Sequence, residues 1–150
     1  MIKKIFVLFV ITTLIGCGYN PIFSNKKNSN LVVKNFQVIG DKELNRKIIS
    51  TLNLKKNDAD ESKFSLMINS EKKLDIVSKD KTGNASVYRT TILVKLSLNE
   101  ENKIIKSKDF SSSFTYNNIE NKFDLTQYQK SIELNLINKI SEEIFIFLKL

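Results

Sequence analysis

The sequence predicts an α+β fold, a two-layer sandwich in which a four-stranded sheet is covered by two helices on one face. Stretches of alternating apolar and polar residues indicate strands, and two stretches with apolar residues every three or four positions indicate amphipathic helices. Their order along the chain is β-α-β-β-β-α. Each helix has one apolar face that must be buried, and a sheet is the partner that this order supplies.

The first strand is predicted over residues 31–39, which are rich in Val, Ile and Phe, and Gly40 ends it. Asp41 is predicted to cap a helix over residues 42–52. Leu44, Ile48 and Leu52 give this helix one apolar face. A helical crossover requires the first strand to run parallel to any strand of the same sheet that it joins.

Three further strands are predicted to form an antiparallel meander. They cover residues 63–78, 87–98 and 103–116. The first of them is expected to be bent or bulged near Glu71 and Lys72, where the alternation is interrupted. Turns are expected at residues 79–84 and 99–102, and a charged loop is expected at residues 55–62 before the meander.

A long helix is predicted over residues 124–148, with Asp124 as its N-cap and Gln127 at the capping-box position. Its apolar residues recur every four positions: Tyr128, Ile132, Leu136, Ile140 and Ile144. The segment 144–148 is apolar all round. It is therefore expected either to pack deeply in the domain or to form an exposed docking patch.

The N-terminus has the pattern of a secretory signal. Lys3 and Lys4 precede an apolar run over residues 5–15, which is shorter than the ~20 residues of a membrane span. Gly16 precedes Cys17, the only cysteine, and this ending is similar to a bacterial lipobox. We expect cleavage of residues 1–16 and acylation of Cys17, against the alternative of an ordinary signal or uncleaved anchor with an incidental cysteine.

Removing this signal leaves 134 of the 150 residues. Residues 17–30 are then a lipidated anchor and a flexible tether, and residues 31–150 form one domain. Two or three acyl chains hold a small protein firmly, because each buried CH2 contributes ~0.8 kcal/mol. The two lysines of the signal are also lost, so the net charge falls from +8 to +6.

The composition argues against an enzyme. The chain has no histidine and a single cysteine, which rules out Ser-His triads, thiol-His dyads, zinc sites built from Cys and His, and disulfides within the chain. Five candidate carboxylates belong to no motif and are interpreted as solvated charges: Asp75, Asp80, Asp109, Glu120 and Asp124. We predict no catalytic residue, no cofactor and no metal site.

The basic charge has two interpretations. It can form a surface for anionic lipids or sugar phosphates, or it can reflect the Lys, Asn and Ile usage of an AT-rich genome. Nucleic acid is not expected as a partner of an exported lipoprotein. Lys79, Lys81 and Arg89 flank the first turn of the meander, and Lys122 lies before the last helix; together they form a candidate phosphate clamp, or simply a solvated turn.

The order of the motifs resembles the LptE family, the LPS-assembly lipoproteins that accompany the outer-membrane lipopolysaccharide translocon. Each motif is weak alone, and together they cover nearly the whole mature chain. The matching segments are the anchor at residues 17–23, the strand-to-helix junction at 40–48, the hairpin at 76–89 and the Ser-Phe-Thr-Tyr-Asn segment within 111–117.

The resemblance implies a protein of the outer membrane, anchored on its periplasmic side by acyl chains such as palmitate. It implies a β-barrel translocon protein as the partner that the domain plugs, and lipopolysaccharide as the ligand. It places the lipid contacts at Lys79 or Lys81 and at Lys122. The alternatives are a scaffold lipoprotein without a lipid ligand, and a periplasmic hydrolase that uses two close carboxylates.

Overall fold

The computed structural model describes residues 32–56, 63–101 and 103–149. The predicted signal peptide, the predicted acylation site at Cys17 and the predicted tether all lie outside these residues. Within the described part of the chain, no helix is both long enough and apolar enough to span a membrane.

The elements follow the predicted order. They are β1 (Val32–Val33), β2 (Asn35–Gly40), α2 (Lys42–Thr51), β3 (Lys55–Lys56), β4 (Phe64–Lys79), β5 (Ala85–Glu100), β6 (Lys103–Asn117) and α3 (Lys122–Lys149). The main sheet has the strand order β2-β4-β5-β6. β2 runs parallel to β4, and β4, β5 and β6 are antiparallel neighbours, which confirms both the crossover and the meander.

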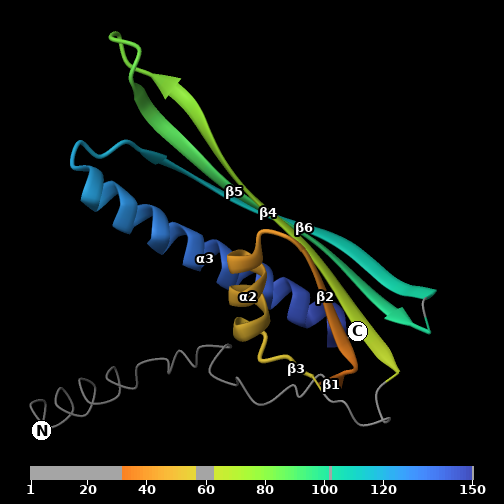
Figure 1. Ribbon diagram of the computed structural model, residues 1–150. Helices are drawn as coiled ribbons and strands as arrows, with labels where there is room; N and C mark the ends of the chain where they lie inside the picture. Colours follow the sequence, from red (N-terminus) through yellow and green to blue (C-terminus); the bar gives the residue numbers. More distant parts are fainter. Residues whose placement is uncertain (1–31, 57–62, 102, 150) are drawn as a thin grey trace, which may run out of the picture.

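The two helices cover the same face of this sheet, as predicted (Figure 1). α2 packs on β2 and β4, whereas α3 runs beneath β5 and β6 and also touches α2. The β4–β5 hairpin is longer than the region that α2 covers, and its tip extends past that helix (Figure 1). The sandwich is therefore complete in its middle and open towards the hairpin tip.

The first strand is not continuous, which corrects the prediction of one strand over residues 31–39. It divides at Lys34 into β1 and β2, and β1 pairs in parallel with β3 in a separate two-stranded sheet. The expected charged loop at residues 55–62 therefore begins with a strand, while its residues 57–62 are outside the described part. The detour buries Val33, which is only 1% exposed, in the core.

The irregularity of β4 predicted at Glu71 and Lys72, a bend or a bulge, lies elsewhere in the strand. Both residues keep regular pairing with β5, and the register shifts lie between Ile76 and Lys79 instead. Lys72 interrupts the apolar alternation but stays in register, and its Nζ pairs with Oε2 of Glu133 in α3 at 2.8 Å. The irregularity falls where the hairpin extends beyond α2.

Asp41 caps α2 as predicted. Its Oδ1 accepts hydrogen bonds from the backbone N–H groups of Glu43 and Leu44, both at 3.0 Å. α3, however, begins at Lys122 and not at Asp124. Its first turn is capped by Asn121, whose Oδ1 accepts from the N–H of Phe123 at 2.9 Å and of Asp124 at 3.3 Å. Asn is as good a cap as Asp, and it comes three residues earlier.

One apolar core lies between the helices and the sheet. Of the α3 residues predicted every four positions, Ile132, Leu136, Ile140 and Ile144 belong to this core, and Ile140 and Ile144 are fully buried. Tyr128 does not belong to it and is 39% exposed. The C-terminal segment packs largely on the domain itself, since Phe147 meets Phe110 edge to face with 5.8 Å between ring centroids. Only Ile146 of this segment is strongly exposed, at 57%.

Candidate functional site

The tip of the β4–β5 hairpin is a tight turn built around Asp80. The Asp80 Oδ1 accepts hydrogen bonds from the hydroxyl of Thr82 at 2.7 Å and from the backbone N–H of Asn84 at 2.9 Å. Gly83 supplies the positive φ of +88° that the turn requires. The Thr82 hydroxyl, followed by the backbone donors, lowers the pKa of Asp80 below its ordinary value. The carboxylate is therefore occupied by the turn that carries Lys79 and Lys81.

The beginning of α3 is tied to the base of this turn through Asn118. Its backbone N–H donates to the Ser86 carbonyl at 2.8 Å, and its side-chain amide donates to the Ala85 carbonyl at 2.9 Å. Ala85 is the pairing partner of Lys79 across the hairpin. Lys122 comes only four residues after Asn118, so it lies at the same end of the molecule as Lys79.

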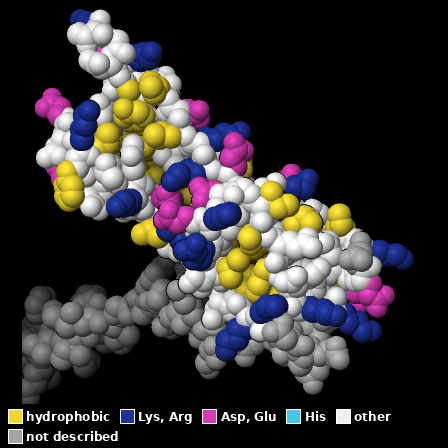
Figure 2. Space-filling view, in the orientation of Figure 1, with side chains coloured by type: hydrophobic (Ala, Val, Ile, Leu, Met, Phe, Trp, Pro, Cys, Tyr) yellow, Lys and Arg dark blue, Asp and Glu magenta, His cyan; other side chains and the backbone are white. Residues whose placement is uncertain are grey.

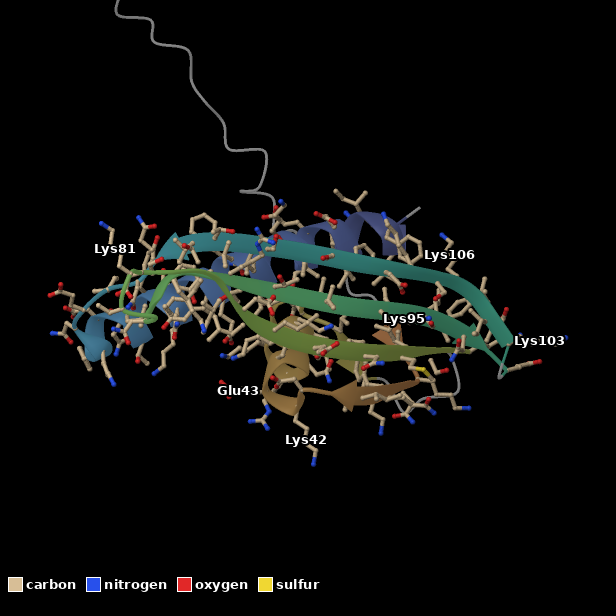
Figure 3. The ribbon with its side chains drawn as sticks, turned by 90° about the horizontal axis from the view of Figure 1, so that it is seen from above. Lys42, Glu43, Lys81, Lys95, Lys103 and Lys106 are labelled. Carbon is tan, nitrogen blue, oxygen red and sulfur yellow. The ribbon has the colours of Figure 1, made fainter. Side chains whose placement is uncertain are left out.

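Three of the four predicted basic residues therefore gather at one end. Lys79, Lys81 and Lys122 are all exposed, and no ion pair involves them among the described residues. Figure 3 shows Lys81 at this end of the sheet and Lys103 at the opposite end. Acidic residues share the surface, namely Asp80, Glu120 and Asp124. Lys122 was predicted to lie before the last helix, and it is instead the first residue of α3.

Arg89 is not brought together with the lysines. It lies on the face of the sheet that the helices leave open, where its Nε donates to the Thr115 hydroxyl of β6 at 3.2 Å. Its cross-strand neighbour is Asp75, which places a carboxylate beside the guanidinium. Four residues also separate it from Ala85, or about 13 Å along a strand.

An apolar strip, defined here as Leu74, Ile76 and Tyr88, runs from α2 towards the lysines. Leu74 and Ile76 lie on the helix side of β4, in step with Lys72, yet they are 53% and 52% exposed because no helix covers them. Tyr88 pairs with Ile76 on the same face. Figure 2 shows the hydrophobic surface over this part of the hairpin.

An aromatic row connects this strip to α3. Tyr88 stacks on Tyr116 of β6 with centroids 5.8 Å apart, and Tyr116 meets Tyr128 of α3 edge to face at 5.7 Å. The buried Tyr116 hydroxyl shares a hydrogen bond with the Thr90 hydroxyl at 3.2 Å. Sequence reasoning did not find the strip. The signal was the continued alternation at Leu74 and Ile76 beyond the length that a ten-residue helix covers.

The opposite end of the strip is closed by ion pairs around Glu133 of α3. Its two carboxylate oxygens meet the ammonium groups of Lys47 from α2 and Lys72 from β4, each at 2.8 Å. Partial burial raises the pKa of Glu133, but the hydrogen bonds from both lysines outweigh it, and the pKa lies below its ordinary value. The hydrogen bond to Glu133, then that to Glu43, raises the pKa of Lys47. The ion pairs of Glu133 therefore join α3 to both α2 and β4.

We expect Glu133→Gln to lower the free energy of unfolding by about 1 kcal/mol at neutral pH, because two partly exposed ion pairs are lost. A carboxyl whose pKa is depressed by folding stabilises above its unfolded pKa of about 4.3, and this contribution disappears as the pH falls through the folded value. The stability difference should therefore vanish at acidic pH. Urea unfolding of both proteins between pH 3 and 8 measures this difference in the free energy of unfolding. Glu71→Gln, at an exposed pair with Lys73, is the control and should change stability little.

The described residues offer no arrangement for metal chemistry. No group of three or more Cys, Asp and Glu side chains within residues 32–56, 63–101 and 103–149 could hold a metal ion. The candidate carboxylates are dispersed: Asp75 and Asp109 belong to different strands, Asp80 holds the turn, and Glu120 and Asp124 flank the start of α3. What this surface offers is exposed ammonium groups beside an apolar strip.

Comparison with known proteins relates this fold to bacterial lipoproteins. The rare lipoprotein B of Shewanella oneidensis matches 77% of this chain and 93% of its own, with a TM-score of 0.58 and 15% identity. A minor lipoprotein of Acinetobacter baumannii matches 77% and 90%, with a TM-score of 0.55 and 12% identity. A lipoprotein B of Nitrosomonas europaea matches 76% and 82%, with a TM-score of 0.55 and 9% identity.

The fold is shared with these lipoproteins over most of both chains. No family model matches the sequence, and neither does any curated protein. The likeness is therefore one of architecture, at identities too low for residue roles to be transferred from one chain to the other.

Proposed function

We propose that this protein is an outer-membrane lipoprotein that assembles with a β-barrel lipopolysaccharide translocon and binds lipopolysaccharide during its insertion into the outer leaflet. The observation that carries the proposal is the gathering of Lys79, Lys81 and Lys122 at one exposed end. The fold shared with bacterial lipoproteins, the lipobox at Cys17 and the resemblance to the LptE family support it.

Binding is the mechanism that these side chains allow. Lysine ammonium groups are compact point charges that bind phosphate, and the phosphates of lipid A and of the core sugars are the matching anions. Asn118 fixes the start of α3 to the hairpin, so the ammonium groups come from two elements held in place together. Competition for these phosphates would loosen lipid aggregates before the lipid passes outward.

The open face of the sheet suits a polar surrounding such as the lumen of a barrel. Its central residues are mostly hydroxyl, amide and charged side chains, and they include Thr91 and Lys95 of β5 and Asp109, Ser111, Ser113 and Thr115 of β6. Figure 3, seen from above, shows Lys95 on this face. A surface of this kind would meet a polar wall without burying unpaired apolar groups.

The decisive experiment purifies the acylated mature chain from outer membranes in mild detergent. We expect a large β-barrel protein to co-purify and lipopolysaccharide to bind. Reversing the three charges, with Lys79→Glu, Lys81→Glu and Lys122→Glu, should weaken lipopolysaccharide binding by roughly tenfold or more, since losing charge-assisted contacts costs about 1.5 kcal/mol or more and 1.4 kcal/mol is tenfold. The barrel should remain bound.

The matched control makes the same change of net charge elsewhere, at Lys42, Lys95 and Lys103, which lie on α2, on the open face and at the far end of the sheet (Figure 3). It should leave lipid binding intact. Unchanged binding in the first variant would remove the lysines from the site. A barrel partner without lipid binding in the unaltered protein would favour the scaffold alternative, and the absence of any barrel partner would contradict the translocon assignment.

A further inference from the structure

The apolar strip of Leu74, Ile76 and Tyr88 is not covered by a helix, although it lies on the face of the sheet that α2 and α3 cover elsewhere. β2 pairs with β4 only as far as Ser70, and α2 lies over the same region. Beyond that point β4 continues for nine residues, none of them buried, and Lys72 is the helix-side residue that α3 still reaches. Leu74 and Ile76 lie beside Tyr88 and form one contiguous apolar surface, and contiguous exposed apolar surface is the kind that marks ligand or partner sites.

The strip has polar groups at both ends and a wall along one side. Lys72, with its Glu133 partner, closes one end, and Lys79 and Lys81 stand at the other. Lys122 precedes Glu133 in α3 by eleven residues, or about three helical turns, so both lie on the helix side that faces the hairpin. From Leu74 to Lys79 the strand rises roughly 17 Å.

This arrangement fits an amphiphile and not a simple anion. An elongated apolar surface ends at three exposed ammonium groups, which is the distribution of a lipid whose acyl chain is joined to a phosphorylated headgroup. The aromatic row from Tyr88 to Tyr128 borders the strip, because the Tyr116 ring contacts both the Tyr88 ring and the Tyr128 ring. A protein partner would be expected to pair with the free edge of β4 and would not require the lysines.

We propose that the apolar strip binds a fatty acyl chain of the same glycolipid whose phosphate meets Lys79, Lys81 and Lys122. This inference rests on the proposed function and adds a subsite to it. The chain lies along Leu74 and Ile76 against Tyr88, and the headgroup lies at the hairpin tip. Recognition then depends on the acyl chains as well as on charge.

The test uses the mature full-length chain in phosphatidylcholine nanodiscs with two probes, hexa-acylated lipid A and the same bisphosphorylated disaccharide without its acyl chains. Leu74→Asn with Ile76→Asn should weaken lipid A binding about tenfold and leave the deacylated probe unchanged. The control is Ile104→Asn with Ile105→Asn, which alters two exposed aliphatic residues at the opposite end. Neither pair is buried, so both variants should fold, and circular dichroism checks this.

A photoreactive residue at position 76 identifies the occupant directly. It should capture lipid A, and the same residue at position 105 should not. Capture of a protein instead would overturn the acyl-chain assignment. If the lysine variant weakens both probes while the strip variant weakens neither, the inference fails and the proposed function stands. If lipid A does not bind but photoreactive dodecanoate is captured at position 76, the proposed function fails and the strip remains a site for an acyl chain.

Discussion

Replacing Gly40 by alanine is expected to destabilise the domain by about 3 kcal/mol or more. Gly40 has a φ of +82°, a conformation that costs other residues on the order of 1–3 kcal/mol. An added Cβ would also collide with the carbonyl oxygen of Ser70, which belongs to the backbone of β4 and cannot swing away. That same oxygen accepts the hydrogen bond from the N–H of Asp41 at 3.0 Å, just before α2.

Gly83 provides the matched control for this prediction. Its φ of +88° is nearly the same, but nothing lies within 4 Å of an added Cβ. Gly83→Ala should therefore cost only the backbone strain, about 1–2 kcal/mol. Urea unfolding of both variants measures the difference. Equal losses at the two positions would mean that β2 and β4 do not approach each other as closely as described.

The sequence was sufficient to predict the architecture because local signals and tertiary demands agree over most of the chain. Alternation, the Asp41 cap and the four-residue period of α3 each lead to the element that forms. Prediction from the sequence failed where long-range contacts override local patterns. Lys72 breaks the apolar alternation of β4 and yet keeps its regular pairing, and the charge that it meets on the helix side comes from Glu133, which is distant in sequence.

The candidate site was predictable only in part for a related reason. The three lysines could be chosen from their places beside turns, but their gathering depends on the hydrogen bonds of Asn118 to Ala85 and Ser86, which sequence spacing does not reveal. Arg89 was grouped with them by its position near the turn, yet strand parity turns its side chain to the open face. The apolar strip depends on where α2 ends relative to β4.

α3 fixes Lys122 relative to the hairpin, and its packing depends on a few buried residues. We expect Ile140→Ala to lower the free energy of unfolding by about 2–5 kcal/mol, because its side chain is fully buried and the cavity left behind adds to the lost burial. Ile146→Ala, at a residue that is 57% exposed on the same helix, should cost less than about 1 kcal/mol. Thermal unfolding compares them.

The two variants also separate stability from binding. Ile140 follows Lys122 on α3 by eighteen residues, which is about five helical turns, and its side chain lies in the core. Below its unfolding midpoint, the Ile140→Ala chain should therefore bind lipid A with the affinity of the unaltered protein, because the folded molecules keep Lys122 beside the hairpin. A loss of affinity while the chain is still folded would show that α3 moves when its core contact is lost. Equal destabilisation by both alanines would instead mean that α3 is rotated about its axis from the orientation described, and Lys122 and Glu133 would then no longer face the strip.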